Sequence, residues 1–449
     1  MALSGMDIFK LLPKTNCQEC GVPTCLAFAM KLAAGQAELA SCPYVSDEAR
    51  EKLEEAATPP IRPVTIGAGD SAFKIGGETV LFRHEKTFVN KTGIAVSLTD
   101  SMEDSAVAER LKRFQELQYV RVGLTLKADC VAVKDTLHDK NKFVSLIEKV
   151  KAAGINNLVL MSEDPEMQAA ALSACKELRP LIYAACNGNG EAFGKLAKEY
   201  SCPLAVKGKN LDEVAERTAQ LTAMGIKDLV IDTGSRQLSQ AFQDQVAVRR
   251  LALLNKFRPL GFPTIVFPCE MTEDPLKEAL IAATFIAKYG GILVLSDITG
   301  HSLFPLLVQR MNIYTDPQRP MATTEGIYEI NNPDENSPVC ITSNFSLTYF
   351  IVSGEIESSR VPTWLLIKDT EGLSVLTAWA AGKFVADAIA LFVKKCGIEQ
   401  KIKHRTLVIP GAAASISGEL DEELPEWKIS IGPREAAHIT PFLKNWKPE

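Results

Sequence analysis

The sequence predicts an α/β protein in three parts: a small cysteine-rich domain, a central (β/α)8 TIM barrel and a C-terminal Rossmann-like domain. Three observations predict this order. Four of the eleven cysteines fall in the first 45 residues, short apolar segments alternate with helical patterns from residue 93, and this alternation restarts after a proline-rich break. A chain of 449 residues is also too long for one hydrophobic core.

Composition excludes several classes of protein. The net charge is −6 and no cluster of Lys and Arg is present, which argues against a nucleic-acid groove. No apolar run reaches the length of a membrane span, and the N-terminus lacks the pattern of a secretory signal. Lone cysteines without an export signal indicate a reducing compartment. We therefore expect a cytoplasmic protein that binds neither nucleic acid nor membrane.

Prolines mark the expected boundaries. We expect a cysteine domain at 1–57, a linker and hairpin at 58–92, the barrel at 93–313, a second linker at 314–338 and an α/β domain at 339–449. The cysteine domain shows helical patterns at 5–12, 26–39 and 47–57. Thr58–Pro63 contains three prolines and predicts a stiff, extended linker. Segments 72–75 and 79–82 flank Gly76-Gly77, which predicts a hairpin.

Eight near-continuous apolar segments indicate strands of a parallel sheet that is buried on both faces. Eight strand-helix units over this length match a TIM barrel, and a doubly wound open sheet is the alternative. The expected strands are 94–100, 130–135, 158–162, 181–186, 203–206, 229–232, 264–267 and 292–297.

The C-terminal part shows the same alternation on a smaller scale. The expected strands are 339–342, 364–368, 407–409 and 427–431, and the expected helices are 346–357, 373–395 and 434–444. Ligands of such domains bind at the carboxyl ends of the strands.

Four cysteines at the N-terminus have the spacing C-x2-C-x4-C-x16-C: Cys17, Cys20, Cys25 and Cys42. Thiolates at such spacing bind Zn2+ or an iron–sulfur cluster. The unequal steps and the proline after Cys42 favour a [4Fe–4S] cluster, because zinc motifs usually show paired C-x2-C units. Zinc and free thiols stay open as alternatives.

At Asn16–Cys25 and Ser41–Pro43 the sequence resembles the large (gamma) subunit of the corrinoid iron–sulfur protein of the reductive acetyl-CoA pathway. The segments 339–345 and 369–379 are similar to the corrinoid-binding domain of that family. The resemblance covers the whole chain and implies the same order of three domains.

The resemblance also implies an activity. In that family the corrinoid cobalt, as Co(I), takes a methyl group from methyltetrahydrofolate on a separate methyltransferase and gives it to acetyl-CoA synthase, the partner of CO dehydrogenase. A [4Fe–4S] cluster reduces inactive Co(II). The four N-terminal cysteines would be the cluster ligands, and a smaller barrel subunit would complete a heterodimer. The chain would be a methyl-carrier component, and whether it is an enzyme by itself stays open.

No histidine of this chain lies in an Asp-x-His-x-x-Gly motif, which supplies an axial cobalt ligand in many corrinoid proteins. A missing axial donor makes reduction of cobalt easier, so we expect a base-off corrinoid. The candidate contacts lie on strand ends and the loops that follow them. They are Cys340, Thr342, Ser346, Thr370, Glu371, Gly372, Leu373, Ser374, Gly411, Ala412, Gly432, Pro433, Arg434, Glu435 and Ala436.

Two other functions fit parts of the sequence. One is an iron–sulfur electron-transfer protein without corrinoid, and the other is a barrel methyltransferase that acts alone. Polar residues at barrel strand ends would be the candidates for the second function, but acidic strand ends also cap helices, and we assign them no catalytic role. They are Asp100, Asp135, Ser162, Glu163, Asp232, Glu270 and Asp297.

Overall fold

The computed structural model describes residues 5–33, 37, 39–46, 48–50, 53, 58–121, 124–316 and 321–447. The chain forms two compact units. The first comprises Met1–Leu81, Phe88–Leu117 and Ala128–Tyr314, and the second comprises Phe82–Thr87, Gln118–Lys127 and Thr315–Glu449. Among the described residues, none of the helices has the length and hydropathy that a bilayer crossing requires.

Two helices form the core of the cysteine region. Helices α1 (Gly5–Leu11) and α2 (Cys25–Ala33) bury Ile8 and Phe28 in one apolar cluster. The helix expected at 5–12 is therefore confirmed, and the helix expected at 26–39 begins at the third cysteine. A 3₁₀ turn, η1 (Leu39–Ser41), leads to Cys42. Most of the helix expected at 47–57 lies outside the described residues.

A short antiparallel pair closes the amino-terminal end of the barrel. Strand β1 (Val64–Ile66) pairs with β2 (Phe73–Ile75), and Val64, Ile66 and Ile75 are fully buried among the barrel strands. The expected hairpin is thus wrong: residues 79–82 form no strand, because β2 pairs with the segment before it. The proline segment, expected to be an extended linker, bends at Thr58, Pro60 and Ile61. It is attached to the barrel, since the Arg62 N–H donates to Gly261 O at 2.9 Å.

Eight parallel strands form the barrel, and the strand order is β10-β9-β8-β7-β6-β3-β12-β11. A parallel bridge between Ile231 and Thr264 joins the two ends, which excludes the open sheet. The strands are β3 (Gly93–Thr99), β6 (Cys130–Lys134), β7 (Leu158–Met161), β8 (Leu181–Ala185), β9 (Leu204–Lys207), β10 (Leu229–Asp232), β11 (Ile265–Val266) and β12 (Ile292–Leu295).

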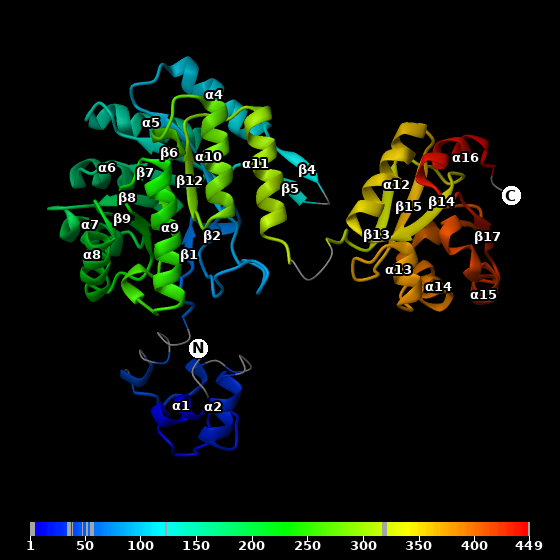
Figure 1. The fold of residues 1–449 in the computed structure, drawn as a ribbon, viewed down its shortest axis with the longest axis horizontal. Helices are drawn as coiled ribbons and strands as arrows, with labels where there is room; N and C mark the ends of the chain where they lie inside the picture. The colour runs from blue at the N-terminus through cyan, green and yellow to red at the C-terminus, as the bar shows by residue number, and fades with distance from the viewer. Residues whose placement is uncertain are drawn as a thin grey trace. The chain divides into compact units, whose positions relative to one another are not determined.

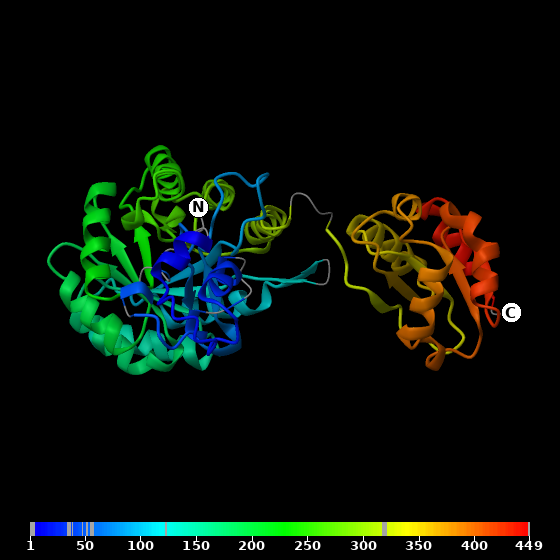
Figure 2. The same cartoon turned by 90° about the horizontal axis from the view of Figure 1, so that it is seen from below.

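A helix follows each barrel strand and lies outside it (Figure 1; Figure 2). The helices are α4 (Asp104–Glu116), α5 (Lys140–Ala152), α6 (Pro165–Cys175), α7 (Gly190–Glu199), α8 (Leu211–Ala223), α9 (Leu238–Leu253), α10 (Pro275–Ala287) and α11 (Gly300–Ile313). The chain order therefore confirms the predicted TIM barrel. An additional antiparallel pair, which the sequence did not predict, is formed by β4 (Tyr119–Arg121) and β5 (Leu124–Leu126).

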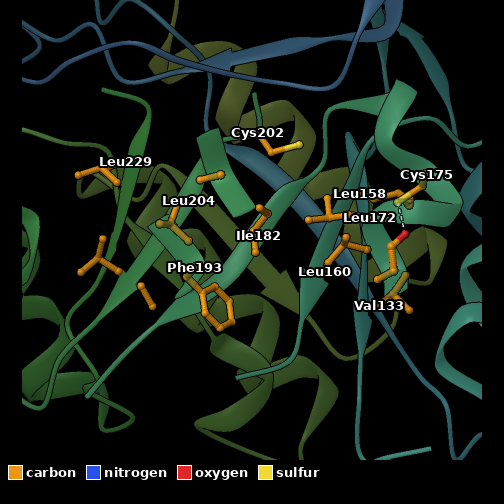
Figure 3. Close-up of a cluster of buried hydrophobic side chains, with 14 of the residues drawn as sticks. Val133, Leu158, Leu160, Leu172, Cys175, Ile182, Phe193, Cys202, Leu204 and Leu229 are labelled. Carbon is orange, nitrogen blue, oxygen red and sulfur yellow. Dashed lines mark hydrogen bonds between the residues drawn. The ribbon is translucent and has the colours of Figure 1, made fainter. Parts of the chain in front are cut away.

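The layer between strands and helices holds the largest apolar cluster (Figure 3). Two lone cysteines belong to it. The Cys175 thiol donates to Ala171 O at 3.1 Å. Burial raises the pKa of Cys175 to about 12 and that of Cys202 to about 11, so both stay protonated at neutral pH. They serve as small apolar residues, as buried free cysteines commonly do.

The C-terminal domain has a five-stranded mixed sheet in the order β13-β15-β14-β16-β17. Strands β14 (Val339–Ser343), β15 (Thr363–Lys368), β16 (Thr406–Ile409) and β17 (Lys428–Ile431) are parallel and match the expected strands. Strand β13 (Gly326–Ile330) is antiparallel to β15. It lies inside the segment 314–338, where a linker was expected, and it forms one edge of the sheet.

Five helices accompany this sheet: α12 (Ser346–Ser359), α13 (Val375–Ala380), α14 (Ala386–Cys396), α15 (Ser417–Glu423) and α16 (Ile439–Asn445). The helix expected at 346–357 is confirmed. The helix expected at 373–395 is instead two helices, because Gly382 adopts φ +70 and ends the first of them. The last expected helix begins at Ile439 rather than at 434, after a 3₁₀ turn, η8 (Ala436–His438).

Candidate cofactor sites

The four N-terminal cysteines are free thiols that lie on two segments. Cys17 and Cys20 are half-buried in the loop between α1 and α2. Cys25 is the first residue of α2 and is 6% exposed, and Cys42 follows η1 and is 3% exposed. A helix N-terminus favours negative charge, so this end of α2 suits a thiolate ligand.

The loop between α1 and α2, which carries Cys17 and Cys20, has several residues in the left-handed conformation. Four of its residues adopt positive φ: Lys14 at 59°, Asn16 at 50°, Gln18 at 64° and Gly21 at 72°. Left-handed residues that alternate with ordinary ones turn successive N–H groups toward one side, which forms the concave nests that bind anions and iron–sulfur clusters. The backbone of this loop therefore fits an anionic group held by thiolates.

Side chains connect the two ends of the loop. Asn16 Oδ1 accepts from the Cys25 N–H at 2.8 Å, while the Asn16 N–H donates to Cys25 Sγ at 3.4 Å. Thr24 Oγ1 accepts from the Ala27 N–H at 3.1 Å and caps α2. Tyr44 Oη donates to Glu19 Oε1 at 2.7 Å and links the segment after Cys42 to the C-x2-C loop.

Among the described residues, no group of three or more His, Cys, Asp or Glu side chains already surrounds a single metal position. Four thiolates can bind one zinc ion or an iron–sulfur cluster.

A cavity of about 320 Å3 lies in the C-terminal domain, between one face of its sheet and helices α12 and α16. It opens at the carboxyl ends of β14, β16 and β17, where the sequence predicted a ligand. Its walls are largely apolar and include Val352, Ile356 and Phe442. Ile351 and Leu376 are 46% and 56% exposed at the same site and give it an apolar rim.

One buried hydroxyl of the cavity wall, Thr342 Oγ1, has no hydrogen-bond partner among the described residues, and Thr342 is 2% exposed. A buried hydroxyl without a partner costs about 1–3 kcal/mol. Thr342 was predicted as a corrinoid contact, and its hydroxyl could donate to or accept from the amide groups of such a ligand. Ser346, another predicted contact at the first turn of α12, also has a buried hydroxyl without a partner among the described residues, but it does not line the cavity.

Two candidate metal ligands of this domain, the Cys340 thiol and the His404 imidazole, are not placed to bind a metal in this cavity. Cys340 lines the cavity, but burial raises the pKa of its thiol to about 12, so it is protonated at neutral pH. No histidine is part of the described cavity wall. His404 lies before β16 and uses both ring nitrogens, with Nε2 2.9 Å from Ser337 O and Nδ1 accepting from the Thr406 N–H at 3.2 Å.

Eight of the fifteen predicted corrinoid contacts line the cavity. They are Cys340, Thr342, Ser374, Ala412, Gly432, Pro433, Arg434 and Ala436. They come from β14 and from the segments that follow β15, β16 and β17, which the fold brings together.

The other predicted contacts do not line the cavity wall. Thr370 and Gly372 both donate their backbone N–H to Asn344 Oδ1, at 3.0 and 2.9 Å, and the Thr370 hydroxyl donates to the same oxygen at 2.9 Å. Asn344 therefore organises the loop that also holds Glu371 and Leu373. Gly411 has a different role: a Cβ there would lie 2.5 Å from Gly432 O, so glycine permits two loops to touch. Glu435 is exposed beside the cavity residues.

Residues of α12 and α16 form much of the wall, and the sequence analysis missed them. They are Thr348, Ile351, Val352, Ile356, Ile439, Phe442 and Leu443. Apolar side chains at these helical spacings look the same whether they pack in a core or line a cavity. The helices alone therefore gave no signal of a ligand.

The mouth of the barrel holds charged side chains that pair with one another. Arg236 donates to both Asp232 carboxylate oxygens, at 3.0 and 2.8 Å, and to Glu270 at 2.5 Å. Lys134 donates to the other Glu270 oxygen at 2.7 Å, and Tyr183 Oη donates to Asp232 at 2.7 Å. Burial raises the pKa of Glu270, but the hydrogen bonds from Lys134 and Arg236 outweigh this and leave it below its ordinary value.

The remaining strand-end residues are also engaged. Glu163 accepts from Lys207 at 2.6 Å, Asp297 accepts from Arg113 at 2.6 Å, and Asp135 accepts from Ser162 at 2.8 Å. Asp100 accepts from the Thr136 N–H at 2.8 Å, in the loop after β6. These carboxylates therefore order loops and one another, which is a structural role.

These features define a class of multidomain cofactor-binding proteins. The cysteine loop suits an iron–sulfur cluster, the charged residues at the barrel mouth pair with one another, and the α/β domain has a ligand-sized cavity. Comparison with known proteins identifies the family. A family model described as CO dehydrogenase/acetyl-CoA synthase delta subunit matches residues 63–443, and a family model for an Fe-S cluster matches residues 12–44.

Curated relatives match almost end to end. The corrinoid/iron-sulfur protein large subunit of Moorella thermoacetica is 46% identical over 444 residues, which cover 99% of each chain. The gamma subunits of the acetyl-CoA decarbonylase/synthase complexes of Methanopyrus kandleri and Archaeoglobus fulgidus are each 37% identical, and the matches cover 98% and 99% of this chain and 97% and 99% of theirs. The chain therefore belongs to the family of corrinoid/iron-sulfur protein large subunits and these gamma subunits.

Proposed function

We propose that this chain carries a methyl group between enzymes of the reductive acetyl-CoA pathway, from methyltetrahydrofolate on a methyltransferase to acetyl-CoA synthase/CO dehydrogenase. When bound, a base-off corrinoid supplies the cobalt ion for this transfer, and a [4Fe–4S] cluster supplies the electron that restores oxidised cobalt. The chain acts with the small subunit of the corrinoid iron–sulfur protein as a heterodimer. Family membership and the names of the relatives support this assignment.

The C-terminal cavity is the observation that carries the proposal. Its walls are largely apolar, and its volume of about 320 Å3 would hold one part of a corrinoid, with the apolar rim available to the rest. Thr342 would hydrogen-bond polar substituents of the ligand, and exposed Arg434 at the rim would supply a cation for a phosphate or an amide.

The cysteine loop supports the second cofactor. Cys17, Cys20, Cys25 and Cys42 would be the cluster ligands, and the nest of N–H groups would stabilise the charge of the cluster. The barrel contributes no chemistry in this proposal, because the carboxylates at its mouth are occupied by neighbouring cations and N–H groups.

Metal analysis of the heterodimer tests this function. The full chain and its small subunit are purified without oxygen, and cobalt, iron and the absorption spectrum are measured. We expect about one cobalt and about four iron atoms per heterodimer, with the spectrum of a base-off corrinoid. Iron without cobalt would overturn the carrier function in favour of a plain electron-transfer protein. One zinc ion in place of iron would overturn the cluster assignment.

A further inference from the structure

We propose that Asn16 is a positioning residue that holds Cys25 and sets the strength of a backbone hydrogen bond to its sulfur, and thereby the reduction potential of the cluster. This inference rests on the cluster assignment proposed above. Asn16 directly precedes the first cysteine, whereas its contacts are with the third, nine residues later. It therefore connects the two ends of the loop that carries three of the four thiols.

The contact between the two residues is reciprocal. The side-chain oxygen of Asn16 accepts from the Cys25 N–H at 2.8 Å, and the Asn16 N–H lies 3.4 Å from Cys25 Sγ as its donor. The two bonds close a small ring, so losing one of them frees the other to lengthen. The Cys25 N–H is also one of the first N–H groups of α2, which have no partner inside the helix. The Asn16 side chain thus accepts a hydrogen bond from a free N–H group of the helix terminus and at the same time holds Cys25 in position.

The backbone explains why asparagine suits this position. Residue 16 has φ 50°, a left-handed conformation that asparagine and glycine tolerate better than other residues. Only asparagine of these two also supplies an oxygen that reaches across the loop. The side chain is exposed on its outer side, so a substitution does not open the apolar core.

A hydrogen bond to a ligand sulfur affects the cluster in a known direction. Added negative charge on reduction strengthens an N–H···S bond, so the bond stabilises the reduced state and raises the reduction potential. Loss of the Asn16 side chain should therefore weaken that bond and lower the potential. The same loss should loosen the attachment of Cys25 and make iron easier to remove.

Two substitutions separate the side chain from the backbone. Asn16→Gly permits the left-handed φ, keeps the N–H donor and removes the whole side chain with its oxygen acceptor. Asn16→Asp keeps an oxygen acceptor for the Cys25 N–H. Thr24→Ala is the matched control, because it removes a side-chain cap from the same loop, beside the same cysteine, without touching residue 16.

The measurements are made on the full chain with its small subunit, by EPR-monitored redox titration and by iron release to a chelator. We expect Asn16→Gly to lower the ratio of reduced to oxidised cluster about threefold at a fixed solution potential and to speed iron release at least threefold. Asn16→Asp should keep iron release near the wild-type rate, and Thr24→Ala should change neither quantity.

The outcomes distinguish two kinds of failure. If the wild-type protein binds no iron–sulfur cluster, the proposed function itself fails. If it binds the cluster and Asn16→Gly behaves like Thr24→Ala in both measurements, the role of Asn16 is wrong and the proposed function stands. Rapid iron release from Asn16→Asp would also overturn the role, because the oxygen acceptor would then not be what retains Cys25.

Discussion

The mouth of the barrel and the cavity of the C-terminal domain occupy equivalent places, since both lie at the carboxyl ends of parallel strands. Their polar groups differ. At the barrel mouth Arg236, Asp232 and Glu270 bind one another, and Tyr183 and Lys134 complete the network. In the C-terminal domain the space is open and apolar, and the Thr342 hydroxyl in its wall has no partner among the described residues.

This difference shows how to separate a ligand site from a scaffold when the fold favours both. Strand ends of either domain are positions where ligands commonly bind. A polar group that already has hydrogen-bond partners gains little from a ligand. A buried polar group without a partner has lost its hydrogen bonds to water, and a ligand can replace them. The comparison therefore supports the proposal that the ligand binds in the C-terminal domain and that the barrel mouth has a structural role.

The largest expected effect is on the barrel side. Arg236→Met leaves Asp232, which is 1% exposed, and Glu270 without their shared cation. Breaking a buried ion pair from one side costs about 3–5 kcal/mol. The Arg236 side chain is 24% exposed, so we expect a fall of about 3 kcal/mol in the free energy of unfolding, measured by denaturant titration.

A surface pair serves as the control for that substitution. Lys195→Met breaks the contact with Glu191, whose side chain is 75% exposed, and should change stability by less than about 0.5 kcal/mol. Cobalt content should stay at the wild-type level in both variants. A loss of cobalt or of methyl transfer in a folded Arg236→Met protein would show that the barrel mouth takes part in function.

The sequence predicted most of the fold because burial leaves a clear pattern. Barrel strands such as Leu158–Met161 are buried on both faces and read as continuous apolar runs. The hairpin prediction was wrong because Gly76-Gly77 signals a turn but does not show that Glu78, just after it, is buried against Arg249. Pairing across a long distance in sequence decided the structure there.

The sites were predictable where chemistry is local. Cysteine spacing and strand ends can be read along the chain, and they located the thiols and eight of the 21 residues that line the cavity. The role of Thr370 could not be read in this way, because it depends on Asn344, which lies on a different strand end. The cavity-lining face of α12 could not be predicted for a related reason. Only the fold shows that this apolar face lines a cavity and does not pack in a core.

The next effect tests the cavity by filling it. Ala412 lines the wall, and Ala412→Phe places an aromatic ring in a space of about 320 Å3. We expect cobalt per heterodimer to fall at least tenfold, equivalent to about 1.4 kcal/mol, while iron stays constant. Ala437→Phe adds the same ring at an exposed position outside the described wall and should bind cobalt normally. Normal cobalt in Ala412→Phe would contradict the placement of the corrinoid.

The smallest expected effect distinguishes a buried hydroxyl that contacts the ligand from one that does not. Thr342 and Ser343 are neighbours on β14 and both have buried hydroxyls without a partner, but successive strand residues point to opposite faces, and Thr342 is the one that lines the cavity. Without corrinoid, Thr342→Val and Ser343→Ala should each stabilise the domain by about 1 kcal/mol, because each removes an unsatisfied group. With corrinoid, Thr342→Val should weaken binding about fivefold and Ser343→Ala should leave it unchanged. Equal effects of the two variants on corrinoid binding, measured by titration of the cobalt-free heterodimer, would mean that the Thr342 hydroxyl does not contact the ligand.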